Sequence, residues 1–159
     1  DDLIKKNICM NNSTILILGA GGSAMSIANS LLRESIESKI SILNRTISNA
    51  DKLVDYFSNN NLQIHKTGSV YDLVINTTPI SMSADKVTFP NNFIKPSTTC
   101  YDLFYSNQQT TFQEWSIRNG IEICYDGLGM LIEQAKHSFT IWNNKIPDVT
   151  SLEEQLRLT

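Results

Sequence analysis

The sequence contains few of the residues that build disulfides and metal sites. Its 159 residues include three cysteines and two histidines, and none of these stands at the short spacing of a metal-binding motif. The odd number and wide separation of the cysteines predict reduced thiols in a cytoplasmic protein. We therefore expect neither structural disulfides nor a bound metal.

Basic residues and long apolar runs are scarce as well. Lys and Arg total 13 against 16 Asp and Glu, and the net charge of -3 argues against a nucleic-acid-binding surface. No apolar run approaches the roughly 18 residues needed to span a bilayer, so we expect no membrane span, and we expect no signal peptide. The remaining composition, 41% hydrophobic and 18% charged, is typical of one globular domain with a sizeable core.

The most informative stretch joins a predicted strand to a predicted helix through glycines. Thr14–Leu18 is a run of five apolar or β-branched residues, typical of a strand buried on both faces. Apolar residues recur at helical spacing from Gly22 to Ser35, and between the two lies the pattern Gly-x-Gly-x-x-Ala. This order of strand, turn and helix favours dinucleotide binding over an ordinary turn without a ligand. We predict that the pyrophosphate meets the free N–H groups at this helix start, where the turn comprises Gly19, Ala20, Gly21, Gly22 and Ser23.

The end of the next predicted strand, Lys39–Leu43, indicates which dinucleotide is bound. NAD-binding domains carry an Asp or Glu about 20 residues past the glycines, where it accepts hydrogen bonds from the ribose. Here Asn44, Arg45 and Thr46 follow the strand, and no acid is present. Because a guanidinium clamps a phosphate through two parallel hydrogen bonds, we predict NADP, with Arg45 on the 2′-phosphate and its two neighbours donating beside it. The alternative is a solvated arginine at a strand end.

Strands and helices alternate through the rest of the chain. Further strands are predicted over Leu62–His65, Tyr71–Ile75, Thr98–Phe104 and Ile121–Cys124, and Ser81–Pro96 is predicted as a loop. Further helices are predicted over Ser48–Phe57, Thr111–Asn119, Leu128–Trp142 and Thr150–Leu158. The first has Ser48 as its predicted N-cap and Asp51 three residues on, close to a capping box. The alternation predicts an α/β, Rossmann-like, doubly wound and mainly parallel sheet with helices on both faces. Ligands of such sheets bind beyond the carboxyl ends of the strands.

We predict a single domain over residues 1–159 that ends in a helix within 148–159. The sequence does not begin with Met and opens on what resembles the end of a helix. We therefore expect the C-terminal part of a longer protein, with residues 1–12 as a linker helix from an N-terminal domain.

Several motifs resemble the NADP-binding domain of the shikimate dehydrogenase family. They are Gly19-Ala-Gly-Gly-Ser23, Asn44-Arg-Thr46, Asn76-Thr-Thr-Pro79, Asp102-Leu-Phe-Tyr105 with Thr110, and Asp126-Gly-Leu-Gly-Met-Leu131 with Gln134. The last motif is the most specific, and the resemblance covers nearly the whole chain. The chain departs from the family pattern at Asn49, where Lys or Arg is usual, at Ser81, where Gly is common, and at Asn107, where Pro is frequent.

The resemblance implies NADPH-dependent reduction of 3-dehydroshikimate to shikimate, in the chorismate route to aromatic amino acids. It implies that the segment from Asn44 to Asn49 holds the 2′-phosphate, and that Tyr105 and Gln134 face the substrate. The other cofactor contacts that it implies are Thr77, Thr78, Leu103, Gly127 and Met130, with Leu103 and Gly127 near the nicotinamide. Asp102 is expected either to orient the substrate side or to cap its turn.

The family's proton-transfer Lys and Asp belong to its N-terminal domain and have no counterpart here. We therefore predict no catalytic residue in this chain, and we expect the isolated 159 residues to bind NADPH weakly without turnover. The alternatives are a quinate-using relative and a stand-alone dinucleotide-binding module without catalysis. The expected partner is a small-molecule substrate, without nucleic acid or membrane, in a monomer or a homodimer.

Overall fold

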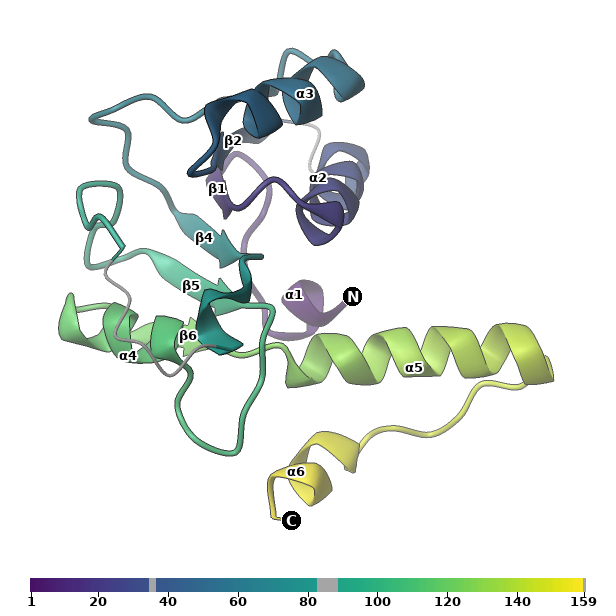
Figure 1. Cartoon of the computed structure of the whole chain (residues 1–159). Coiled ribbons are helices and arrows are strands. Elements are labelled where there is room, and N and C mark those ends of the chain that lie inside the picture. The colour runs from purple at the N-terminus through teal and green to yellow at the C-terminus, as the bar shows by residue number, and fades with distance from the viewer. Residues whose placement is uncertain (35–36, 83–88, 159) are drawn as a thin grey trace.

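The computed structural model describes residues 1–34, 37–82 and 89–158. Six parallel strands form one sheet in the order β3-β2-β1-β4-β5-β6 (Figure 1). The strands are β1 Thr14–Leu18, β2 Lys39–Leu43, β3 Leu62–Ile64, β4 Leu73–Asn76, β5 Thr99–Asp102 and β6 Ile123–Tyr125. The helices are α1 Asp2–Lys5, α2 Gly22–Glu34, α3 Ile47–Phe57, α4 Thr111–Arg118, α5 Leu128–Asn143 and α6 Leu152–Arg157, with a 3-10 turn η1 at Pro79–Met82. The predicted doubly wound parallel sheet is confirmed.

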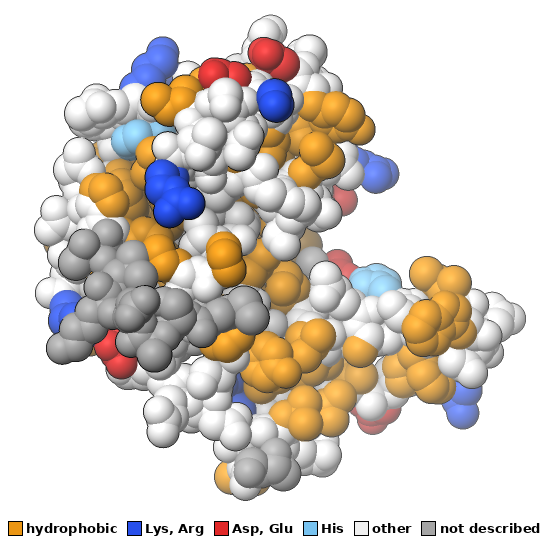
Figure 2. All heavy atoms as spheres, viewed as in Figure 1, with side chains coloured by type: hydrophobic (Ala, Val, Ile, Leu, Met, Phe, Trp, Pro, Cys, Tyr) orange, Lys and Arg blue, Asp and Glu red, His pale blue; other side chains and the backbone are white. Residues whose placement is uncertain are grey.

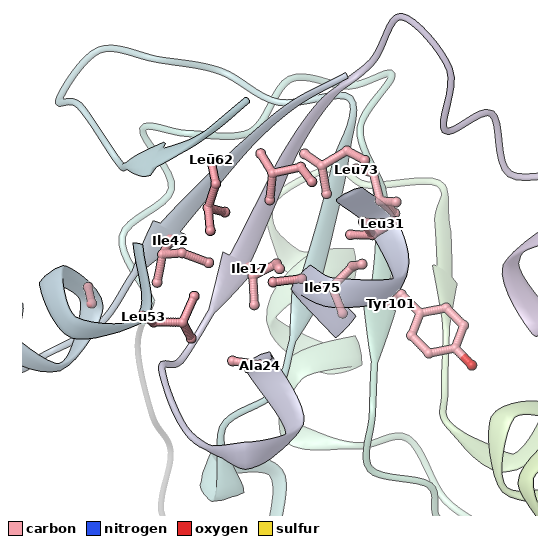
Figure 3. Packing of buried hydrophobic residues seen from close by; sticks show 13 residues of the cluster. Ile17, Ala24, Leu31, Ile42, Leu53, Leu62, Leu73, Ile75 and Tyr101 are labelled. Atoms are coloured by element: carbon pink, nitrogen blue, oxygen red, sulfur yellow. The ribbon is translucent and has the colours of Figure 1, made fainter. Parts of the chain in front are cut away.

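Apolar residues cover both faces of this sheet, as the uninterrupted run in β1 predicts. On one face, Ile17 of β1 and Ile42 of β2 lie against Ala24 of α2 and Leu53 of α3 (Figure 3). On the other face, a second cluster brings strand residues together with two aromatic side chains of α4. Its members are Leu16, Leu18, Tyr71, Val74, Phe93, Cys100, Phe112, Trp115 and Ile121. The sheet is therefore a layer between helices, which leaves the carboxyl ends of its strands for a ligand.

The N-cap of helix α3 lies two residues before the predicted N-cap, and the helix begins one residue before its predicted range, at Ile47. Its N-cap is Thr46, which has an extended backbone (φ -97°, ψ 102°) and makes no side-chain cap bond. The carbonyl of Thr46 accepts the side-chain amide of Asn44 at 2.8 Å and the N–H of Asn49 at 3.1 Å. The helical turn therefore forms directly after the short loop, and Ser48 lies inside it. The predicted capping box of Ser48 and Asp51 is wrong.

Three strands have other bounds than predicted, because backbone N–H groups at their predicted ends donate hydrogen bonds outside the sheet. The N–H of Tyr71 donates to Phe93 at 3.0 Å, so β4 starts only at Leu73. The N–H of Phe104 turns to the Asp102 carboxylate at 3.2 Å, so β5 ends early. The N–H of Ile121 donates to the end of α4 at 3.1 Å, which delays β6.

The two ends of the chain are less helical than predicted. Within residues 1–12 only Asp2–Lys5 is helical, because Asn7 adopts a left-handed φ of 54° after the last turn. Within 148–159 the helix covers Leu152–Arg157. Helix α6 folds back beneath α5, which projects from the body of the molecule as an arm (Figure 1).

Hydrophobic side chains gather on the projecting arm (Figure 2). At its far end Ile141 and Trp142 are 79% and 81% exposed. Among the described residues, no helix combines the length and apolar character that crossing a bilayer requires.

Candidate dinucleotide-binding site

The predicted cofactor residues lie on loops at one edge of the sheet, because the strands are parallel and their carboxyl ends coincide. The chain leaves β1 toward β2 and later returns to β4 on the other side of β1. At such a switch point the neighbouring loops diverge and leave a crevice, which is where doubly wound sheets bind ligands.

Gly19 is fixed by the protein's own packing. Its φ of +110° is a left-handed value that disfavours any side chain, and a Cβ there would lie 2.5 Å from the Thr77 hydroxyl. The Gly19 N–H donates to Leu43 at 2.8 Å, and the Thr77 hydroxyl donates to Leu18 at 2.7 Å. Gly19 thus follows β1, is hydrogen-bonded to the end of β2 and packs against Thr77, which follows β4.

Gly21 and Gly22 are open where Gly19 is crowded. Both are exposed, and a Cβ built on either meets no atom within 4 Å. Helix α2 begins at Gly22, so the first N–H groups of the helix have no partners within it. Ser23 is also exposed and Ala20 is half-buried, while the small Ala24 is fully buried against the sheet. The open turn at a helix start therefore fits a pyrophosphate, and no described residue outside this turn and its helix comes within 4 Å of a Cβ at Gly21 or Gly22.

Arg45 is a free cation at the end of β2. It is exposed, and within the described part of the chain its guanidinium makes no hydrogen bond or ion pair. Asn44 is half-buried, and its side-chain amide donates a hydrogen bond to the Thr46 carbonyl. This bond fixes the loop that carries Arg45. Thr46 and Asn49 are exposed beside it. The loop fits a phosphate group with one strong cation and several neutral donors.

Thr77 and Thr78 line the opposite side of the switch point with their hydroxyl hydrogens already in use. Thr78 donates to the Asn76 side chain at 2.6 Å, and Thr77 donates to the β1 carbonyl described above. Both are half-buried. They hold the wall of the crevice, and only their oxygen lone pairs remain for a ligand.

The sequence did not reveal a buried network around Asp102, which has no exposed surface. Its carboxylate accepts the Asn76 amide at 2.9 Å, the Ser81 hydroxyl at 2.5 Å, the Thr110 hydroxyl at 2.6 Å and the Phe104 N–H at 3.2 Å. Burial raises the pKa of Asp102, and these donors oppose that shift only in part. The structure therefore favours the turn-organising role over contact with a substrate.

One signal in the sequence points to part of this network. Thr110 and Gln113 form a capping box for α4, a Thr-x-x-Gln pattern that is readable from sequence. Asn76 and Asp102 are brought together by the sheet register, which only the structure shows.

The residues predicted at the nicotinamide end converge on the start of α5. Gly127 lies so close to β5 that a Cβ would overlap the Leu103 carbonyl, and its N–H donates to Phe104 at 3.0 Å. Leu103, Met130 and Gln134 line a pocket of about 430 Å³ between α1, α2 and α5. The structure thus brings together two predicted cofactor residues and one predicted substrate residue.

Tyr105 does not line this pocket. It is 44% exposed on the loop after β5, and among the described residues its hydroxyl has no hydrogen-bond partner. Gln134 is exposed and likewise has no partner within the described residues. Both side chains are free to meet a substrate.

Three groups near the start of α1 could in principle hold a cation. One ligand atom each of Asp1, Glu133 and His137 lies within 4.8 Å of the others. Glu133, however, already accepts a hydrogen bond from Lys5 and lies 3.6 Å from the Lys136 ammonium. Its charge is compensated by these two cations, so the cluster carries no argument for a metal.

Comparison with known proteins points to one family. The model described as "Shikimate / quinate 5-dehydrogenase" matches residues 2–89, and that described as "Shikimate 5'-dehydrogenase C-terminal domain" matches residues 127–157. The curated shikimate dehydrogenase (NADP(+)) of Blochmanniella floridana is 41% identical over 160 residues, which cover 93% of this chain and 54% of that protein.

Solved structures agree with this match. A crystal structure of an Ael1 enzyme from Pseudomonas putida superposes with a TM-score of 0.82 at 29% identity, covering 97% of this chain and 59% of that one. Shikimate dehydrogenase from Aquifex aeolicus gives a TM-score of 0.78 at 26% identity, with 97% and 58% covered. The chain thus spans about half the length of the curated relatives it matches.

Proposed function

The chain belongs to the shikimate dehydrogenase family, and on this premise we propose that it forms the NADP(H)-binding part of an oxidoreductase. The proposed reaction of the whole protein is the interconversion of 3-dehydroshikimate and shikimate with NADP(H). We place it in aromatic amino acid biosynthesis, in the cytoplasm. Family membership supports the pathway, and the three free cysteines support the compartment.

One observation carries the choice of cofactor. Arg45 follows β2 and is exposed, and its guanidinium makes no hydrogen bond or ion pair with any described residue. Its neighbours in the loop, Asn44 and Thr46, are not acidic. An acid at this place would accept from an unmodified ribose and repel a 2′-phosphate. A free guanidinium does the opposite, and the name of the Blochmanniella floridana relative also specifies NADP(+).

Different residues of the chain bind different parts of the cofactor. The turn at Gly21 and the start of α2 hold the pyrophosphate, and Arg45 holds the 2′-phosphate. The backbone at Gly127 and the Met130 side chain form the wall at the nicotinamide end. When bound, NADPH supplies the hydride for reduction of a ketone, and the protein contributes position and electrostatics.

Tyr105 and Gln134 are proposed to orient the substrate rather than to transfer its proton. Neither has an acidic or basic partner among the described residues. General acid catalysis needs a positioned titratable group that exchanges a proton with a partner, and an amide does not titrate. Proton transfer is therefore assigned to none of the residues that the structure describes.

The test is a steady-state assay of the full-length gene product. NADPH oxidation with 3-dehydroshikimate is expected to exceed NADH oxidation, and Arg45→Ala should raise the KM for NADPH with little effect on that for NADH. Preferred turnover of quinate with NAD would indicate the quinate-using alternative. NADPH binding without turnover of either substrate would indicate a non-catalytic binding module.

A further inference from the structure

Asp126 lies at the joint between β6 and α5 and is almost fully buried. It is 5% exposed, and its carboxylate accepts the N–H of Leu128 at 3.3 Å at the start of α5. The next residue, Gly127, packs against the Leu103 carbonyl without room for a Cβ. The Asp126 carboxylate is therefore hydrogen-bonded into the turn that the proposed function places at the nicotinamide.

Arg157 of α6 neutralises this carboxylate from 31 residues away. Its guanidinium donates two parallel hydrogen bonds, Nη2 to Oδ1 at 2.7 Å and Nη1 to Oδ2 at 3.0 Å. Such a bidentate pair fixes orientation as well as charge. The pKa of Arg157 is raised, chiefly by Asp126, and Glu153 contributes through a hydrogen bond of 3.1 Å.

Helix α6 is itself anchored on the side of α5 that bears this joint. Glu153 accepts a hydrogen bond from Lys6 at 3.4 Å, so the segment after α1 holds α6 in place. Helix α6 contributes no residue to the predicted cofactor or substrate contacts. Its link to the site passes through Arg157 and Asp126.

We propose that Arg157 is a positioning residue for the nicotinamide half of the cofactor, acting through the Asp126 carboxylate on the turn at Gly127. The proposal rests on the proposed function, because it requires that NADP(H) binds at this edge. Removing Arg157 leaves a buried carboxylate without its cation, and such a group draws in water or a proton and changes its geometry. The adenosine half binds at Arg45 and Gly21, on loops after β2 and β1, and makes no use of this joint.

Two probes separate the halves of the site. NADPH reports on the whole cofactor, and adenosine 2′,5′-bisphosphate reports on the adenosine end alone. We expect Arg157→Ala to weaken NADPH by about tenfold, comparable to the loss of one charge-assisted hydrogen bond, and to leave the bisphosphate within about twofold. The fluorescence of bound NADPH should shift toward that of free NADPH, because the nicotinamide is less well held.

Arg157→Lys is the second variant. It keeps the charge but lacks the bidentate fork, so we expect an intermediate loss of NADPH affinity and a fold close to that of the wild type. Arg118→Ala is the matched control, since this arginine makes a single exposed pair with Glu114 at 2.6 Å on α4. It should change neither probe. Melting temperatures of the three variants verify that each remains folded.

Equal losses for both probes, or no loss in Arg157→Ala and Arg157→Lys, would overturn the proposal. If Arg157→Ala does not fold, Arg157→Lys decides by the same comparison of probes. A wild-type chain that binds neither probe overturns the proposed function and this inference with it. A wild-type chain that binds both, with Arg157 variants that match it, overturns this inference alone.

Discussion

At the scale of single residues, the glycines of one motif serve different purposes. Gly19 is required by a left-handed backbone and by contact with Thr77, whereas Gly21 has empty space around it. The sequence pattern predicted glycine at both positions for a ligand. Only the structure separates the glycine that the fold needs from the one that a ligand would need.

We predict that Gly21→Val leaves the fold intact and removes dinucleotide binding. A Cβ at this position meets no atom within 4 Å, and the valine side chain would occupy the space proposed for the pyrophosphate. Calorimetric titration with NADPH should show no binding, and the melting temperature should remain near that of the wild type. Gly19→Val is the comparison, and it should lower the melting temperature strongly. Unchanged NADPH affinity in a folded Gly21→Val protein would place the cofactor elsewhere.

Arg45→Ala should affect NADPH and spare NADH. Hydrogen bonds to a charged group contribute about 1.5–3 kcal/mol, so NADPH affinity should fall by roughly one to two decades. Fluorescence titration with both cofactors measures the difference, with Arg118→Ala as the control. Equal losses for NADPH and NADH would exclude the 2′-phosphate as the partner of Arg45.

Site residues could be predicted where they belong to a local sequence pattern. They could not be predicted where their role depends on hydrogen bonds to residues far away in the sequence. The glycines and Arg45 follow directly from a strand–turn–helix pattern and a strand end. The role of Asp102 depends on Ser81 and Thr110, which reach it from two other segments. The pairing of Asp126 with Arg157 likewise joins residues that no local pattern connects.

At the scale of elements, helix caps explain where prediction of boundaries succeeds. Helix α4 has a complete capping box at Thr110 and Gln113, and it begins at the predicted Thr111. Helix α3 has no side-chain cap bond, and its N-cap was predicted two residues too late. The spacing of apolar residues predicts that a helix or strand exists. Where it begins or ends depends on which group pairs with its terminal backbone N–H or carbonyl.

Thr110→Ala should lower stability more than Thr46→Ala does. The Thr110 hydroxyl accepts the Gln113 N–H at 3.1 Å and donates to buried Asp102, whereas Thr46 makes no cap bond. Loss of such a cap costs about 0.5–2 kcal/mol. For a domain of this size each 1 kcal/mol lowers the melting temperature by about 2–4 °C. Thr110→Ser keeps the hydroxyl and should melt near the wild type, and equal melting of the two alanine variants would contradict the role of this cap.

At the scale of the whole molecule, both ends of the chain meet on α5. Lys5 of α1 bonds to Glu133, Lys6 bonds to Glu153 of α6, and Arg157 bonds to Asp126. A Cβ on Gly129 would overlap the Asp2 carboxylate, so α1 packs directly on the helix backbone. The sequence predicted the helices but not this meeting, because it depends on pairs of side chains that lie far apart in the sequence, by 31 residues for Arg157 with Asp126 and by more than a hundred for the two lysine pairs.

Acid should weaken the contact between α1 and α5, because it protonates Glu133. Burial alone would raise the pKa of this carboxyl, but Lys5 and Lys136 outweigh burial and hold the pKa below its ordinary value. A lowered pKa means that the stabilisation is complete above the unfolded pKa, about 4.3, and is lost as the pH falls through the folded value.

Melting curves of wild type and Glu133→Gln from pH 7 to pH 3 test this effect. The variant should melt lower at pH 7, and the gap should close as the wild-type carboxyl becomes protonated. Glu122→Gln, an exposed position without a partner among the described residues, should show no gap at any pH. A gap for Glu133→Gln that stays constant down to pH 3 would contradict the assignment.

The central claim is that these 159 residues fold into an NADP(H)-binding domain that reads the 2′-phosphate. Calorimetric titration of the chain with NADPH and then with NADH tests it most directly. The expected result is one saturable NADPH site per chain that is at least about tenfold tighter than the NADH site, in line with one charge-assisted contact. No binding of NADPH, or equal affinity for the two cofactors, would contradict the account.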